Sequence, residues 1–227
     1  MAANGVSTES RVVSGFDRVW LQVDGAVSEL VVRQGEQESL IVTGRPDILS
    51  RVRTDVIDGR LSITLSGSWS EKLGRALATS LTRQWIRCDL TVNQLTGLEI
   101  GGLGRVHAHS ISSERLALKL HGAGQVKVDS LDAGALQVDL NGACQMEVAG
   151  KVTEQRVVVE GMGHYRSPKL ESRRATVEIR GTGKANVWAT DKLDVMVRGM
   201  GSVEYHGAPK VRKNVTPMAS VVRINGL

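Results

Sequence analysis

The chain has 227 residues, enough for one sizeable β domain or two small ones, and it can bury a core without disulfides or structural metals. Its 25 glycines and only four prolines exclude a collagen-like or proline-rich chain and favour many tight turns. The formal net charge of +5 comes from residues 98–227, because basic and acidic side chains are equal in number before them.

No apolar run is long enough for a transmembrane helix, and the start MAANGVSTESRVV lacks the basic and then apolar segments of a signal peptide. If the protein is exported, this chain is expected to be its processed or truncated form. The two cysteines, Cys88 and Cys144, have no metal-type spacing, and Cys88 is expected in the core because it lies on the apolar phase of a strand-like run.

Residues 10–97 are predicted to form an N-terminal β region of short alternating strands separated by turn residues. Asp58-Gly59 lies between two such runs and predicts a hairpin. In residues 69–83, leucines recur every four positions behind a Ser-x-x-Glu capping box, which predicts an amphipathic helix. We expect this helix to cover one end or face of the β core.

From Leu98 onward, a phrase centred on a Gly-x-Gly turn recurs six times at intervals of 18 to 20 residues, and NVTPMASVV is a degenerate seventh copy. The glycines expected at these turns are Gly102, Gly104, Gly122, Gly124, Gly142, Gly161, Gly163, Gly181, Gly183, Gly199 and Gly201. Cys144 stands where the third glycine pair requires its second member, so that turn must adopt a negative φ there or bear strain.

Each repeat has apolar residues four and two positions before its first glycine and again four positions after it, the period of a strand on both sides of a turn. A unit of about 20 residues is too short for a helix and a return strand, so the repeats must stack on one another. The predicted fold is all-β: a right-handed parallel β-helix, or β-solenoid, over residues 98–227. We expect it to be continuous with residues 10–97 as one structural domain.

The repeated glycines do not predict a dinucleotide site, because a second strand follows each turn where that site needs a third glycine and a helix. His107 and His109 form a His-x-His pair on one side of a strand, and His121 lies one repeat further in a different column. No third candidate ligand stands in the same column at a suitable phase. The sequence therefore predicts no metal site and no cofactor.

Polysaccharide cleavage on a β-helix would need paired carboxylates on adjacent repeats, but the outward columns interleave acids with basic or neutral residues. Asp129 and Asp132 are expected to be turn formers in a loop. We therefore predict no catalytic residue and no enzyme. The basic clusters lack any nucleic-acid-binding motif and are expected to form a solvated face, which could meet acidic glycans or a surface polymer.

The chain resembles the head GIN domain family of bacterial adhesin-like proteins over about residues 10–226. The matching phrases are Gly15-Phe16-Asp17, Gln34-Gly35, Asp58-Gly59 with Leu61 and Ile63, and Tyr205 to Pro209. The chain departs from the family in placing Leu, Ala, Met or Thr between the glycines where the family has Ser. The resemblance implies a pectate-lyase-like β-helix without known catalytic residues, an extracytoplasmic location at the cell surface or in the periplasm, and an adhesive role.

We therefore expect a non-enzymatic extracytoplasmic binding or adhesion module. Two alternatives stay open: a β-helical carbohydrate-active enzyme of the polysaccharide lyase or hydrolase type, and a structural scaffold that oligomerises. The partner is expected to be a glycan or surface polymer, another protein or a second copy of the chain, with no nucleic acid and no membrane insertion. The candidate contact column, just before each turn, is His121, Asn141, Glu160, Arg180 and Arg198.

Overall fold

The computed structural model describes residues 5–65 and 85–225, and the predicted helix at 69–83 lies outside them. The described chain is nearly all β, with 79% strand and 2% helix, and forms a β-solenoid of about 5 turns. The elements are β1 Ser7–Arg11, β2 Arg18–Gln34, β3 Ser39–Gly44, α1 Pro46–Leu49, β4 Val52–Ile57, β5 Arg60–Leu65, β6 Trp85–Val92, β7 Gly97–Gly142, β8 Gln145–Gly161, β9 His164–Gly181, β10 Lys184–Gly199, β11 Ser202–His206, β12 Lys210–Val215 and β13 Ser220–Arg223. Within the described residues, no helix is long and apolar enough to cross a membrane.

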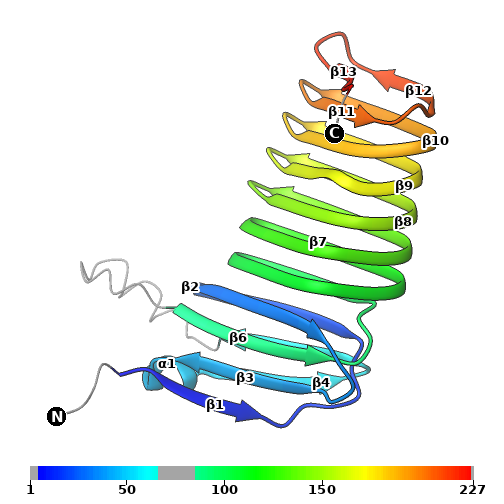
Figure 1. Ribbon diagram of the computed structural model, residues 1–227. Helices are drawn as coiled ribbons and strands as arrows, with labels where there is room; N and C mark the ends of the chain where they lie inside the picture. The colour runs from blue at the N-terminus through cyan, green and yellow to red at the C-terminus, as the bar shows by residue number, and fades with distance from the viewer. Residues whose placement is uncertain (1–4, 66–84, 226–227) are drawn as a thin grey trace, which may run out of the picture.

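The predicted repeats are the rungs of the solenoid, stacked in parallel from β7 to β13 (Figure 1). Each rung has a segment that enters the glycine turn, a segment that leaves it and a segment that returns the chain. Residues 125–128, 131–133 and 135–142, for example, pair with residues 145–148, 150–152 and 154–161. The degenerate copy also takes part, because β12 pairs with β10 and β13 pairs with β11.

The N-terminal region supplies a rung of its own. Residues 18–23 of β2 pair in parallel with residues 97–102, and residues 28–32 pair with residues 104–108. The parallel pairing therefore continues from the N-terminal region into the repeat region, across the boundary predicted at residue 97. One end of the solenoid is formed by β1, β3 and β6, which pair antiparallel, and the other by β12 and β13 (Figure 1).

The Asp58-Gly59 hairpin is confirmed: β4 and β5 pair antiparallel, and both turn residues have positive φ, as a type I′ turn requires. The short helix α1 was not predicted. It begins at Pro46, whose fixed φ suits the first turn of a helix, and it buries Ile48 and Leu49 against the core.

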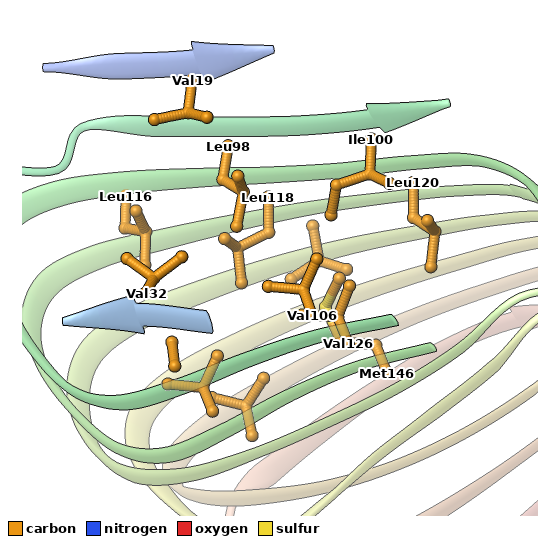
Figure 2. Packing of buried hydrophobic residues seen from close by; sticks show 14 of the residues in the cluster. Val19, Val32, Leu98, Ile100, Val106, Leu116, Leu118, Leu120, Val126 and Met146 are labelled. Atoms are coloured by element: carbon orange, nitrogen blue, oxygen red, sulfur yellow. The ribbon is translucent and has the colours of Figure 1, made fainter. Parts of the chain in front are cut away.

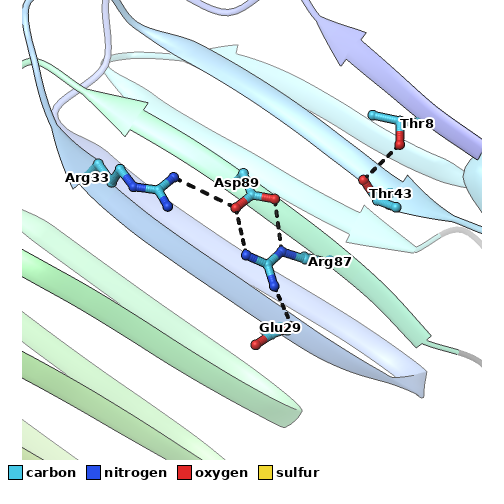
Figure 3. Close-up of polar contacts among 6 residues, drawn as sticks. All are labelled: Thr8, Glu29, Arg33, Thr43, Arg87 and Asp89. Carbon is cyan, nitrogen blue, oxygen red and sulfur yellow. Dashed lines mark hydrogen bonds and ion pairs between the residues drawn. The ribbon is translucent and has the colours of Figure 1, made fainter.

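Polar side chains hold the outer surface of the antiparallel end in register. Arg87 contacts Asp89 on its own strand and Glu29 on β2, and Arg33 contacts the same aspartate (Figure 3). On the neighbouring strands, the hydroxyls of Thr8 and Thr43 lie 3.1 Å apart.

The core is a filled interior between the entering and leaving segments. All three predicted apolar columns are buried, and none of their side chains is more than 3% exposed. Leu118 and Leu120 face Val126 and Met146 across the interior (Figure 2). Burying a side chain of this size contributes about 1.5–3 kcal/mol relative to leaving it exposed, so the stacked columns provide the main stabilisation of the fold.

The first glycine of each predicted turn has positive φ, from +86° at Gly102 to +134° at Gly199. A Cβ at Gly122 would lie 2.8 Å from the carbonyl oxygen of Gly102 in the preceding rung, so the turns stack backbone on backbone. Cys144 has no positive φ, which is the first of the two outcomes predicted for the turn in which it replaces a glycine. Its Sγ lies 3.4–3.5 Å from the carbonyl oxygens of Leu120, Gly122 and Asn141, which stabilises this side chain inside the turn.

Candidate binding groove

A long groove runs along the outer surface of the entering segments. It has three sections, with volumes of about 230, 510 and 610 Å³. The first two sections share Thr96 and Ala117, and the second and third share Arg156, Thr176 and Asp194. The groove therefore extends from β5 and β2 at one end to β12 at the other.

The repeat explains why the groove is continuous. Most of its outward-facing lining residues stand seven, five or three positions before the first glycine of a rung, so the same columns recur along the solenoid. Several of these positions carry small residues that leave space for the groove: Gly97, Ala117 and Ala135. Longer side chains from neighbouring rungs, such as Arg115 and Arg156, rise beside them.

The lining is strongly basic. Its basic side chains are Arg18, Arg60, Arg115, Lys119, Arg156, Arg174, Lys192, Arg212 and Lys213. Its acidic side chains are Glu99, Glu154, Glu178 and Asp194. Nine basic groups against four acidic ones give an excess of positive charge along the groove, which attracts an anionic ligand.

Some of these charges are paired within the groove. Arg174 contacts Glu154 at 2.6 Å, and Asp194 lies 2.8 Å from both Lys192 and Arg212. The Lys192 ammonium and the Arg212 guanidinium hold the pKa of Asp194 below its usual range, so this carboxylate stays charged. Arg115 and Lys119 have no ion-pair partner in the part of the chain that the structure describes. They are the cations most available to a ligand.

An aromatic platform lies at the β2 end of the groove. The guanidinium of Arg60 on β5 stacks 5.3 Å from the ring centroid of Trp20 on β2. Indole faces pack against the apolar faces of extended ligands, and the stacked guanidinium adds a planar hydrogen-bond donor beside the ring. This end of the groove therefore combines apolar contact with positive charge.

The predicted contact column lies on the same outer surface, beside the groove rather than in it. Its members stand one position before the first glycine of each rung, two residues after the groove column that stands three positions before it. None of them lines the three sections. Several pair with neighbouring rungs: Arg180 contacts Glu160 at 2.5 Å, and Asn141 lies 3.4 Å from the same carboxylate. His121 lies 3.8 Å from Glu99.

The turn tips next to this column are apolar and exposed. Leu103, Met162 and Met200 stand between the turn glycines and are 54–65% exposed. The departure from serine seen in the sequence therefore adds an apolar edge beside the groove.

The opposite surface, formed by the leaving segments, holds a cluster of metal-ligating side chains. Nε2 of His107 lies 2.6 Å from Oδ2 of Asp129, and Nδ1 of His109 lies 3.3 Å from the same oxygen. The expectation of no third ligand was wrong. Asp129 was also wrongly placed in a loop: β7 stays extended there, with only a register shift between Val128 and Leu131, and Asp132 lies in β7 as well.

Lys127 contacts the other oxygen of this carboxylate, Oδ1, at 2.8 Å. The ammonium of Lys127, with help from His107, lowers the pKa of Asp129 to about 2. The carboxylate is therefore ionised at neutral pH and can act as a ligand.

Both thiols are buried and protonated. Burial raises the pKa of Cys88 to about 12, and burial also raises the pKa of Cys144. Thiols of this kind are poor nucleophiles and poor metal ligands at neutral pH. Both cysteines are free, and Cys88 lies in the core as predicted.

Comparisons with known proteins agree with this architecture. The family model described as "Putative auto-transporter adhesin, head GIN domain" matches residues 21–209. A "putative adhesin" from Bacteroides fragilis superposes with a TM-score of 0.82 at 20% identity, covering 98% of each chain. A "putative lipid binding protein" from Parabacteroides distasonis gives a TM-score of 0.72 at 18% identity, again covering 98% of each chain. No curated protein matches the sequence.

The fold and the family match together define the class: an adhesin-like β-solenoid built from glycine-turn repeats. Within that class the chain belongs to the head GIN domain family, whose model covers most of its length. The resemblance found in the repeat phrases is thereby confirmed.

Proposed function

We propose that the chain is a non-enzymatic binding module of the bacterial cell surface or periplasm, which holds an extended anionic polymer in the basic groove. The observation that carries the proposal is the excess of basic over acidic side chains along the groove. An acidic polysaccharide or another surface polyanion presents charges at regular intervals. Such a ligand can contact Arg115 and Lys119 on the rung before Gly122 and Arg156 two rungs further at the same time.

The charge state of the carboxyl groups supports binding over hydrolysis. A hydrolase needs one carboxyl kept protonated at neutral pH as a general acid. The pKa values of Asp89, Asp129, Asp191 and Asp194 lie below the usual range, because cations or hydrogen-bond donors face each carboxylate. Among the acids that line the groove, Glu154 and Asp194 contact cations directly.

The ends of the solenoid argue against the scaffold alternative. The edge strand β12 carries Lys210, Arg212 and Lys213, and the edge strand β1 has the polar sequence STESR. Charged and polar edges discourage pairing between sheets of two molecules. We expect the purified chain to be a monomer in multi-angle light scattering.

The experiment measures binding to polygalacturonate as the polyanion, with dextran as the neutral polymer. Binding is expected for polygalacturonate alone and should weaken as salt is raised, since the contacts are charged. The double variant Arg115→Glu and Lys119→Glu should reduce affinity at least about tenfold. The matched control, Arg105→Glu and Arg166→Glu, changes the same net charge on the opposite surface and should cost less than about threefold.

Three outcomes overturn the proposal. Absence of polygalacturonate binding would contradict the proposed groove function. An equal loss of affinity in both double variants would show that only the net charge of the protein matters, not the groove. Release of unsaturated or reducing ends from the bound polymer would favour the alternative that the chain is a carbohydrate-active enzyme. Fractionation of the native host tests the location separately, and recovery of the chain from the cytoplasm would contradict the extracytoplasmic assignment.

A further inference from the structure

We propose that His107, His109 and Asp129 form a binding site for a divalent transition-metal ion, with Zn²⁺ as the ion that suits these ligands best. The site lies on the leaving segments, on the surface opposite the groove, and does not depend on the proposed polymer binding. Two imidazole nitrogens and one carboxylate oxygen form a common ligand set for zinc in proteins.

The repeat brings the three ligands together. His107 and His109 are two residues apart on β7, so both side chains point outward from the same segment. Asp129 stands twenty residues after His109, which is one rung. All three ligand atoms lie within 4.8 Å of one another. They are therefore held by backbone hydrogen bonding rather than by flexible loops.

The distances fit a metal ion after small side-chain movements. Zinc bonds of about 2.0–2.1 Å in a tetrahedral site place ligand atoms about 3.3 Å apart. Nδ1 of His109 already lies 3.3 Å from Oδ2 of Asp129. Nε2 of His107 lies closer, at 2.6 Å, because it now makes a hydrogen bond that the ion would replace. The two rings tilt by 57° with centroids 4.3 Å apart, so they need only turn toward the ion.

The surroundings favour an open site. The three side chains are 35–49% exposed, which leaves a fourth coordination position for water or for a ligand from outside. Lys127 contacts Oδ1 of Asp129, so it orients the carboxylate and leaves Oδ2 for the ion. The same ammonium repels a cation, so Lys127 is expected to limit the affinity.

The test is isothermal titration of the full chain, without a histidine tag, with ZnCl₂ at neutral pH. One ion should bind per chain, and His107→Ala, His109→Ala and Asp129→Asn should each weaken binding at least about tenfold. His121→Ala, a matched histidine on the groove surface, should leave the affinity unchanged. Lys127→Gln should strengthen binding severalfold because a nearby positive charge is removed.

A spectroscopic measurement tests the geometry separately. Co²⁺ should give the intense visible absorption of a tetrahedral site and lose it in His109→Ala, while excess Mg²⁺ should not compete because it prefers oxygen ligands. The proposal is overturned by the absence of saturable binding, by an equal loss in His121→Ala, or by weaker binding in Lys127→Gln. Circular dichroism of each variant confirms that the solenoid is intact before its affinity is interpreted.

Discussion

The hydroxyl of Tyr165 donates a hydrogen bond to the side-chain carbonyl of Gln155, 3.1 Å away inside the solenoid. Both side chains are almost completely buried, and the Gln155 amide donates in turn to the hydroxyl of Ser172 at 2.9 Å. Burial raises the pKa of Tyr165, so its hydroxyl stays protonated and remains a donor. A polar network therefore lies within the mainly apolar interior.

Tyr165→Phe should destabilise the fold by about 1–3 kcal/mol, because it leaves the buried Gln155 carbonyl without its donor. Gln155→Leu should cost a similar amount by leaving the tyrosine hydroxyl unpaired. The double variant should cost less than the sum of the two, since neither unpaired partner remains. Urea unfolding of the four proteins measures the coupling, and strictly additive costs would show that this hydrogen bond contributes nothing.

Gly122→Ala should destabilise the protein by about 2–4 kcal/mol, because a side chain there meets a φ of +108° and the carbonyl oxygen of Gly102. Gly5→Ala is the matched control, since nothing lies within 4 Å of the added carbon and the residue has no positive φ. Thermal unfolding of both variants checks the expectation. A loss in Gly122→Ala no larger than in Gly5→Ala would mean that the turn can relax.

Asp89 should make the free energy of unfolding depend on pH. The hydrogen bonds from Arg87, with the charge of Arg33, lower the pKa of this carboxyl in the folded state (Figure 3). A lowered folded pKa gives stability that is present above the unfolded value of about 3.9 and is lost as the pH falls through the folded value. Asp89→Asn should therefore cost about 0.5–1 kcal/mol at pH 7 and almost nothing near pH 2.

Urea midpoints measured from pH 7 to pH 2 test this dependence. Asp47→Asn is the control, because that aspartate forms its ion pair with Arg45 at a more exposed position. We expect a cost below about 0.5 kcal/mol for it. A cost for Asp89→Asn that persists unchanged at pH 2 would contradict the electrostatic explanation.

The repeat region could be predicted because one pattern specifies its local structure, its core and its register together. The glycines at fixed spacing define the turns, and the apolar columns around them define the interior, as Leu120 and Val126 illustrate. Helix α1 was missed because four residues carry no periodicity and depend on a proline and tertiary burial. Gln155 in the core was missed because it stands outside the predicted apolar columns, and its polar partners Tyr165 and Ser172 come from two different segments of the next rung.

The sites were predicted less completely than the fold. Exposure alone indicates the contact column, but the groove depends on how small residues such as Ala117 and Ala135 lie beside longer side chains such as Arg115 and Arg156. Comparing the columns seven and five positions before each glycine would have indicated this alternation. The third member of the histidine cluster was missed because Asp129 was assigned to a loop, whereas the rung remains extended through it.

Each rung pairs directly only with the rungs on either side of it, and the groove takes one set of side chains from each. Adding or deleting one unit of about twenty residues would therefore change the groove by a single strand spacing, ~4.8 Å, and leave the remaining contacts as they are. Under the proposed function, the number of repeats would therefore set the length of polymer that the groove holds. Duplication of one repeat within the gene would lengthen the groove by one rung, and the new rung would use the same rung-to-rung contacts that are already present.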